Sequence, residues 1–263
     1  MIQIEHLVKR HGTRAVVDDI SFSAREGRVT GFLGPNGAGK SSTLRILLGL
    51  DKPTSGSALI DGVPYRSLHR PLLRVGAMLD GPGANKGRTA HAHLRWVAQS
   101  NAIPTSRVDE VLALTGLQDA AQQRIGGFSL GMGQRLGIAT ALLGDPGVLI
   151  LDEPTNGLDP EGIRWMRRFL RSLADAGKVV LVSSHLMSEM EDTADEFVVI
   201  ARGKVVAAGS GVDVRGPHAS LEGAFFALTE EHTEYRGAAE HRGAAEYRGA
   251  AEHGDAVDGG ATR

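Results

Sequence analysis

Apolar residues alternate with polar ones near the start of this chain and form continuous runs further along it. Near the start, apolar and polar residues alternate over Ile2 to Leu7 and over Val17 to Phe22, which predicts antiparallel strands with one buried face. The later strand candidates are mostly continuous apolar runs, which are typical of strands covered on both faces of a sheet. These runs lie at 29–33, 58–60, 75–79, 148–151, 179–182 and 197–200.

Residues 81–145 carry helical periodicity instead. Apolar residues recur at helical spacing over 90–99, 108–114 and 132–143, and the strand pattern disappears between them. We therefore predict an α/β protein with a mixed sheet, antiparallel strands at its N-terminus and an α-helical subdomain inserted at about 81–145. A short helix is predicted at 221–229, where we expect the folded domain, residues 1–229, to end.

The segment 230–263 has a different composition. The hexapeptide Glu-Tyr-Arg-Gly-Ala-Ala at 234–239 recurs, with His or Tyr in second place, at 240–245 and 246–251. A six-residue period matches neither a heptad nor an amphipathic stripe, and one glycine per unit weakens a helix by about 1 kcal/mol. We predict a disordered low-complexity tail, with an accessory binding repeat as the alternative.

Composition sets outer limits on function. The chain has 263 residues, 41% of them hydrophobic, which is enough for one core or for a larger lobe with a smaller subdomain. It has no window near 18 continuous apolar residues and no basic segment followed by an apolar run at its start, so we expect neither a membrane span nor a secretory signal. The absence of cysteine excludes disulfides, and the net charge of −2 argues against a nucleic-acid partner.

The stretch that begins at Gly34 matches the pattern G-x-x-x-x-G-K-[ST] at every fixed position. Glycines in this pattern let backbone N–H groups approach phosphates, Lys40 reaches the terminal phosphates, and the Ser41 hydroxyl can bind Mg²⁺. A strand before the loop and a helix over 41–50 fit this role, because the helix N-terminus favours an anion. The predicted ATP-binding residues of the loop are Gly34, Pro35, Asn36, Gly37, Ala38, Gly39, Lys40, Ser41 and Ser42.

A second motif, a pair of acidic residues, follows the strand at 148–151. Asp152 and Glu153 end this strand, in the arrangement where the first acid binds the magnesium shell and the second polarises an attacking water. Such a pair alone is also explained by strand-end acids that meet solvent. The segment 154–160 that follows, Pro-Thr-Asn-Gly-Leu-Asp-Pro, favours the catalytic interpretation.

In this combination the sequence resembles, over roughly residues 1–229, the nucleotide-binding subunit of ATP-binding cassette (ABC) transporters. The segment 128–135 is similar to the family signature, in the S-L-G-M-x-Q-R variant typical of bacterial ABC-2-type drug and bacteriocin exporters. Asn156 to Asp159 is similar to the D-loop, and His185 follows Ser183 and Ser184 as the switch histidine does. All these motifs occur in the family's order.

The resemblance implies that two such domains pack head to tail, and that each ATP lies between the phosphate loop of one and the signature of the other. It implies Lys40, Glu153 and His185 as catalytic residues, with Glu153 as the base for water and His185 at the γ-phosphate. ATP and Mg²⁺ are the implied cofactors. The metal residues would be Ser41, Asp80 and Asp152, and the residues that reach the second ATP would be Ser129, Leu130, Gly131, Met132 and Asp159.

Two implied positions depart from the family pattern, and a third position, Asp159, has a second explanation. His11 stands where an aromatic residue, most often tyrosine, stacks on adenine, and Asp80 stands where glutamine is usual. Asp159 could equally be a helix cap. The arginines at 164, 167, 168 and 171 lie at helical spacing and are interpreted as a solvated face, with a partner or lipid contact as the alternative.

The resemblance implies an ATPase that powers export through a separately encoded integral membrane permease. We expect a homodimer at the cytoplasmic face of the cell membrane, with no nucleic-acid partner. One alternative is a soluble ABC ATPase without a permease. Another is a nucleotide-gated structural subunit that does not hydrolyse ATP. The transported substrate is not encoded in this chain, because its contacts belong to the permease.

Overall fold

The computed structural model describes residues 1–79, 81 and 83–230, which fall within one compact unit of the chain. Two predictions lie outside the described residues. Asp80, the predicted metal ligand, is one of them, and the repeat tail is the other from residue 231 onward. Glu230 is the last residue of the closing helix, α8 (Leu221–Glu230), which is one residue longer than predicted.

A six-stranded sheet forms the centre of this unit, in the order β5-β6-β7-β3-β8-β9. The strands are β3 (Arg28–Leu33), β5 (Val75–Met78), β6 (Val148–Asp152), β7 (Val179–Ser184), β8 (Glu196–Ala201) and β9 (Lys204–Gly209). All neighbours pair in parallel except β8 and β9. The sequence did not predict β9, because its residues are only half-buried at the edge of the sheet and form no strong apolar run.

A second sheet contains the N-terminal strands in the order β2-β1-β4, all antiparallel. They are β1 (Ile2–His11), β2 (Arg14–Ala24) and β4 (Ser55–Ile60). Helix α1 (Lys40–Leu47) contacts strands of both sheets. It ends three residues before the predicted boundary, because Gly49 follows with a φ of 66° and stops the helix. The mixed α/β class with N-terminal antiparallel strands is confirmed.

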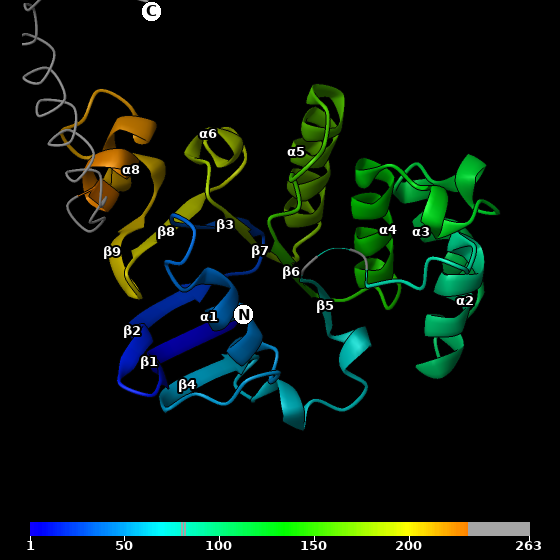
Figure 1. Ribbon diagram of the computed structural model, residues 1–263, viewed down its shortest axis with the longest axis horizontal. Coiled ribbons are helices and arrows are strands. Elements are labelled where there is room, and N and C mark those ends of the chain that lie inside the picture. Colours follow the sequence, from blue (N-terminus) through cyan, green and yellow to red (C-terminus); the bar gives the residue numbers. More distant parts are fainter. Residues whose placement is uncertain (80, 82, 231–263) are drawn as a thin grey trace, which may run out of the picture. The chain divides into compact units, whose positions relative to one another are not determined.

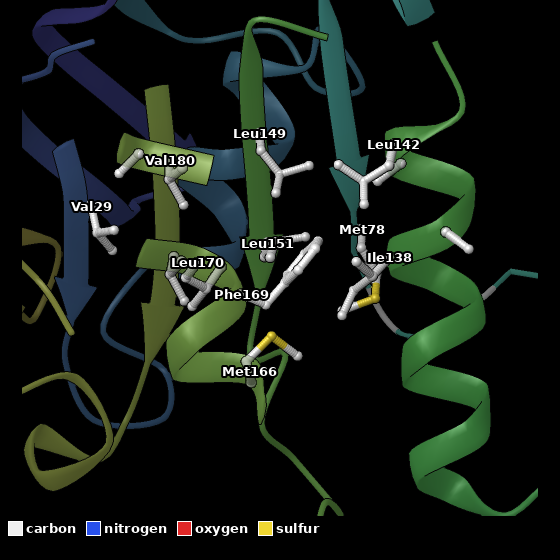
Figure 2. Close-up of a cluster of buried hydrophobic side chains, with 14 of the residues drawn as sticks. Val29, Met78, Ile138, Leu142, Leu149, Leu151, Met166, Phe169, Leu170 and Val180 are labelled. Carbon is white, nitrogen blue, oxygen red and sulfur yellow. The ribbon is translucent and has the colours of Figure 1, made fainter. Parts of the chain in front are cut away.

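Successive residues of the parallel strands bury their side chains on opposite faces of the sheet. Val29, Leu149 and Val180 belong to the core on the face covered by α4 (Leu130–Leu142) and α5 (Pro160–Asp175). Figure 2 shows these three side chains among residues from both helices. The alternate residues of the same strands pack with α1 and the antiparallel sheet. Both faces are therefore buried, which explains the continuous apolar runs.

The segment between β5 and β6 is helical, as its periodicity predicts. Helices α2 (Ala90–Ser100) and α3 (Ser106–Leu114) pack with α4 (Figure 1), and the described residues of this segment contain no strand. Helix α4 also packs against β5, where a Cβ on Gly76 would lie 2.1 Å from the carbonyl oxygen of Ala141. Glycine thus allows the close approach that joins α4 to the edge of the sheet. The boundaries of a separate helical subdomain remain a prediction.

The remaining helices are α6 (Met187–Met190) and α7 (Gly211–Arg215), and α7 and α8 pack together. Within the part of the chain that the structure describes, no helix combines the length and apolar character that crossing a bilayer requires.

Candidate active site

The phosphate loop connects the end of β3 to the start of α1, and the surrounding backbone requires its glycines. A Cβ on Gly34 would lie 2.3 Å from the carbonyl oxygen of Ile200, and one on Gly39 would lie 2.5 Å from that of Val16. Gly37, at a φ of 81°, faces open space instead. The loop is therefore pressed against β8 and β2 on one side and open on the other, where a ligand can approach its backbone.

The open side of the loop borders a hollow of about 340 Å³. Its lining residues are Arg14, Val16, Pro35, Asn36, Gly37, Gly39, Lys40, Ser41, Ser42 and Glu153. Gly39 is the N-cap of α1, and no side chain of the described residues caps this helix end by a hydrogen bond. The first backbone N–H groups of α1 therefore remain available to an anion, as the phosphate-binding interpretation requires. Of the loop residues predicted to bind ATP, only Gly34 and Ala38 do not line the hollow.

Lys40 lines this hollow with a side chain that is only 6% exposed. Its Nζ donates to the carbonyl oxygen of Gly34 at 2.6 Å and lies 3.2 Å from Oε1 of Glu153. A buried ammonium needs such partners, because an unpaired charge away from water is costly. The contact joins the loop after β3 to the acid that follows β6, so two of the predicted catalytic residues are adjacent.

Asp152 and Ser41 meet beside the phosphate loop. Ser41 Oγ donates to Oδ2 of Asp152 at 2.9 Å, and the Ser183 hydroxyl donates to Oδ1 of the same buried carboxylate. Hydroxyl and carboxylate oxygens are ligands that Mg²⁺ prefers, and this ion usually keeps several waters and takes phosphate oxygens as further ligands. Among the described residues, no group of three or more acidic, histidine or cysteine side chains is arranged to hold a metal ion. The pair thus fits Mg²⁺ bound together with a nucleotide rather than a metal site formed by protein alone.

Glu153 and His185 approach one another across neighbouring parallel strands. His185 Nδ1 lies 2.8 Å from Oε2 of Glu153, and the Glu153 backbone N–H donates to both the carbonyl oxygen and the hydroxyl of Ser183. These residues lie far apart in the chain, but the carboxyl ends of β6 and β7 meet at one edge of the sheet. The predicted base and the predicted switch histidine therefore form one hydrogen-bonded pair.

The signature segment lies at a different hollow, of about 350 Å³. It is lined by Ser129, Leu130, Gly131, Met132, Arg135, Gly157, Leu158, Asp159 and Gly162. Ser129 caps α4 by accepting from the Met132 N–H at 3.2 Å, so the helix begins at Leu130, earlier than the expected start near Met132. Among the described residues, the linings of the two hollows have no member in common.

The structure bears on the two interpretations of Asp159. Its Oδ1 accepts from the Gly162 N–H at 2.7 Å, so Asp159 is the N-cap of α5. Asp159 also lines the signature hollow, so its other interpretation, a contact across a dimer, stays a prediction. The Leu130 side chain, 65% exposed, packs where a Cβ on Gly157 would stand, so the signature and the D-loop fit closely together.

The predicted adenine contact and two residues missed by the sequence lie on the first hairpin. His11 ends β1, is exposed and pairs with Arg14 across the hairpin, but it does not line the phosphate hollow. Arg14 and Val16 do line it. No local motif marks these two residues, because only the packing of the hairpin against the phosphate loop brings them there. The role of His11 remains a prediction.

Comparison with known proteins agrees with these motifs. The ABC transporter family model matches residues 17–156, more than half of the chain. The chain belongs to the ABC transporter family. It is 44% identical over 209 residues to the bacitracin transport ATP-binding protein BcrA of Bacillus licheniformis, across 78% of this chain and 68% of that protein. It is 37% identical over 206 residues to the lantibiotic transport ATP-binding protein SrtF of Streptococcus pyogenes, across 78% and 89%.

Solved structures support the same fold. One described as the ATP-binding subunit of an ABC transporter superposes with a TM-score of 0.78 at 27% identity, over 87% of this chain and 99% of the other. The dimeric bacterial ABC transporter cassette MJ0796 superposes with a TM-score of 0.71 at 23% identity, over 80% and 98%, and shows the fold alone. As a member of this ABC family the chain is an ATP-binding ATPase subunit, which confirms the class predicted from the sequence.

We expect Arg14→Ala to weaken ATP binding about twofold to fivefold, the effect of one exposed charge. Arg14 is the exposed first residue of β2 and lines the phosphate hollow, where its guanidinium can face an anionic ligand. Titration with a fluorescent ATP analogue should show the difference at low salt and a smaller one at high salt, because exposed charges are screened. Arg10→Ala on the same hairpin, outside this lining, is the control; equal effects of both changes would contradict a local contact.

Proposed function

We propose that two copies of this chain form a homodimer that closes on two ATP molecules and powers export through a separately encoded membrane permease. One observation carries this proposal: the signature and the phosphate loop border separate hollows of one chain. The signature cannot then complete the nucleotide site of its own chain. A second copy, packed head to tail, would bring each signature to the other copy's phosphate loop.

The contacts of the residues in and around the phosphate hollow support the following roles. Lys40 would exchange its contact with Glu153 for the β- and γ-phosphates, which leaves Glu153 free to accept a proton from the attacking water. His185, now hydrogen-bonded to Glu153, would turn to the γ-phosphate and orient the same base. Ser41 and Asp152 would hold Mg²⁺, which supplies charge neutralisation on the phosphates when bound. Ser129, Gly131 and the start of α4 would bind the γ-phosphate of the opposite ATP.

Export as the direction of transport is supported by the relatives. Besides the bacitracin and lantibiotic transport proteins, the chain is 38% identical over 215 residues to the Nod factor export ATP-binding protein I of Ralstonia nicotianae. We therefore infer an amphiphilic cargo and a peripheral position at the cytoplasmic face of the membrane. The ABC ATPase domain at residues 1–229, with a helical subdomain at about 81–145, belongs to the same proposal, as does a separate tail from 230.

One purification tests the ATPase activity and the membrane partner of this proposal. The tagged chain is expressed in its own host, membranes are solubilised in mild detergent, and the affinity-purified material is assayed for ATP hydrolysis with and without EDTA. We expect an integral membrane protein to co-purify and the complex to hydrolyse ATP, with activity lost in EDTA and restored by excess Mg²⁺. Lys40→Ala is the inactive control.

The alternatives give different results in the same experiment. Hydrolysis without any membrane partner would identify a soluble ABC ATPase. No hydrolysis even with the membrane partner present, together with ATP-dependent dimerisation in light scattering of the purified chain, would identify a nucleotide-gated structural subunit. Activity that persists in EDTA would contradict the roles given to Ser41 and Asp152.

A further inference from the structure

A hydrogen-bonded carboxylate lies next to the catalytic pair and is not part of it. Oε2 of Glu189, on α6, accepts from the hydroxyl of Thr155 and from the hydroxyl of Ser184, both at 2.7 Å. Thr155 is 2% exposed and Ser184 is fully buried, so both hydroxyls depend on a protein acceptor. One oxygen atom therefore connects the loop after β6 to the end of β7.

These two hydroxyls flank the catalytic residues in the chain. Thr155 lies two residues after Glu153, and Ser184 directly precedes His185. Ser184 Oγ also accepts from the backbone N–H of Leu186 at 3.0 Å, so its hydroxyl spans the turn that carries His185. Because the Ser184 hydroxyl donates its hydrogen to Glu189, a lone pair of Ser184 Oγ stays directed at the Leu186 N–H in this turn. Loss of the Glu189 carboxylate would release both backbone segments that place the Glu153 and His185 side chains.

The segment that carries Glu189 is fixed from its other side by α5. Arg167 donates to the carbonyl oxygen of Ser188 at 2.8 Å and to Oδ2 of Asp192 at 3.0 Å, and Arg171 donates to Oδ1 of Asp195 at 2.7 Å. The interpretation of this arginine face as merely solvated was therefore wrong for these two residues. Their contacts hold α6 in place, so the position of the Glu189 carboxylate is well defined.

We propose that Glu189 is a positioning residue for ATP hydrolysis: it sets the geometry of the pair formed by Glu153 and His185 without touching the nucleotide. This inference rests on the proposed roles of those two residues. Small displacements of catalytic groups lower the rate of the chemical step much more than they weaken substrate binding. The effect of changing Glu189 should therefore fall on kcat rather than on KM for ATP.

The test compares three variants of the full chain in its purified complex. Glu189→Ala should lower kcat about 10-fold to 100-fold with KM for ATP changed less than about twofold, as for other groups that orient catalytic side chains. Glu189→Gln should restore most of the activity, because the amide oxygen has two lone pairs and can accept both hydroxyls. Glu191→Ala is the matched control, since Glu191 is exposed next to α6 and its side chain makes no hydrogen bond or ion pair within the described chain. It should retain full activity.

Thr155→Val supplies an independent arm that removes one donor with little change in volume. Alone it should lower kcat with KM unchanged, and in the Glu189→Ala background it should add little, because both changes remove the same contact. This variant decides the question if Glu189→Ala does not fold. The inference is overturned if Thr155→Val leaves kcat unchanged, if Glu189→Gln is as impaired as Glu189→Ala, or if KM rises in step with the loss of kcat. An inactive wild-type complex would instead contradict the proposed function.

Discussion

Replacement of Glu153 by glutamine should abolish ATP turnover and leave ATP bound. The amide has nearly the same shape as the carboxylate but cannot accept a proton, so we expect kcat to fall about 10²-fold to 10⁴-fold. The change also replaces the ion pair between Lys40 Nζ and Oε1 of Glu153 by a contact with a neutral amide. Lys40 is then held less tightly and meets the phosphates more readily, so ATP affinity should be equal or higher. Phosphate release measures turnover, and light scattering with Mg·ATP should detect a dimer that persists.

A second glutamate provides the control for charge alone. Glu161 lies exposed in the first turn of α5, outside both hollows, and Glu161→Gln should retain wild-type turnover. Should Glu153→Gln hydrolyse ATP at a rate close to that of the wild type, Glu153 is not the base. In that case the hydrogen bond from His185 would need another explanation.

The sequence predicted those parts of the site whose residues are local in the chain. The phosphate loop and the acidic pair at the end of β6 each depend on a few consecutive residues, and the structure places them as their motifs indicate. The residues that the sequence missed depend on contacts between distant segments. Arg14 and Val16 reach the hollow only because a hairpin packs on the phosphate loop. Glu189 meets its partners only because β6 and β7 end side by side.

In the fold, too, the sequence predicted the elements that have a local signal and missed those that depend on contacts between distant segments. Continuous apolar runs identified every strand buried on both faces, because burial alone dictates their composition. The edge strand β9 is half-exposed and carries no such signal, so it was missed. The arginines of α5 illustrate the opposite error, since charge at helical spacing does not reveal carboxylates contributed by another loop.

Two inactive variants should restore one another when mixed. Lys40→Ala removes the phosphate-loop cation, and Gly131→Asp places a negative charge in the signature hollow; each homodimer should then be inactive. In a mixed dimer, one of the two composite sites keeps an intact phosphate loop and an intact signature. Random mixing in equal amounts makes half the dimers mixed, so we expect about a quarter of wild-type ATPase activity. Phosphate release against the mixing ratio measures this recovery.

Gly131→Asp is chosen because it should leave the fold intact. A Cβ at this position meets the flexible end of Leu158 at 3.3 Å and the carbonyl oxygen of Gly157 at an ordinary contact distance of 4.0 Å, and an acidic residue in the first turn stabilises a helix. The same carboxylate repels a phosphate group. A mixture of Lys40→Ala with the double variant Lys40→Ala, Gly131→Asp contains no intact site and should stay inactive. Recovery in that control, or none in the first mixture despite dimer formation, would contradict sites shared between two copies.

The position of β3 in the large sheet has a consequence for how the chain folds during synthesis. β3 carries the phosphate loop, yet its neighbour β7 enters the sheet about 150 residues later, as the pairing of Val29 with Val180 shows. At typical rates of translation this separation corresponds to roughly 8 to 30 s. Throughout that interval the nascent strand has an unpaired apolar edge, and the nucleotide site cannot assemble. A ribosome-bound chain is therefore exposed to aggregation until β7 and then β8, the other neighbour of β3, have emerged, and chaperone binding to nascent chains should end once both have.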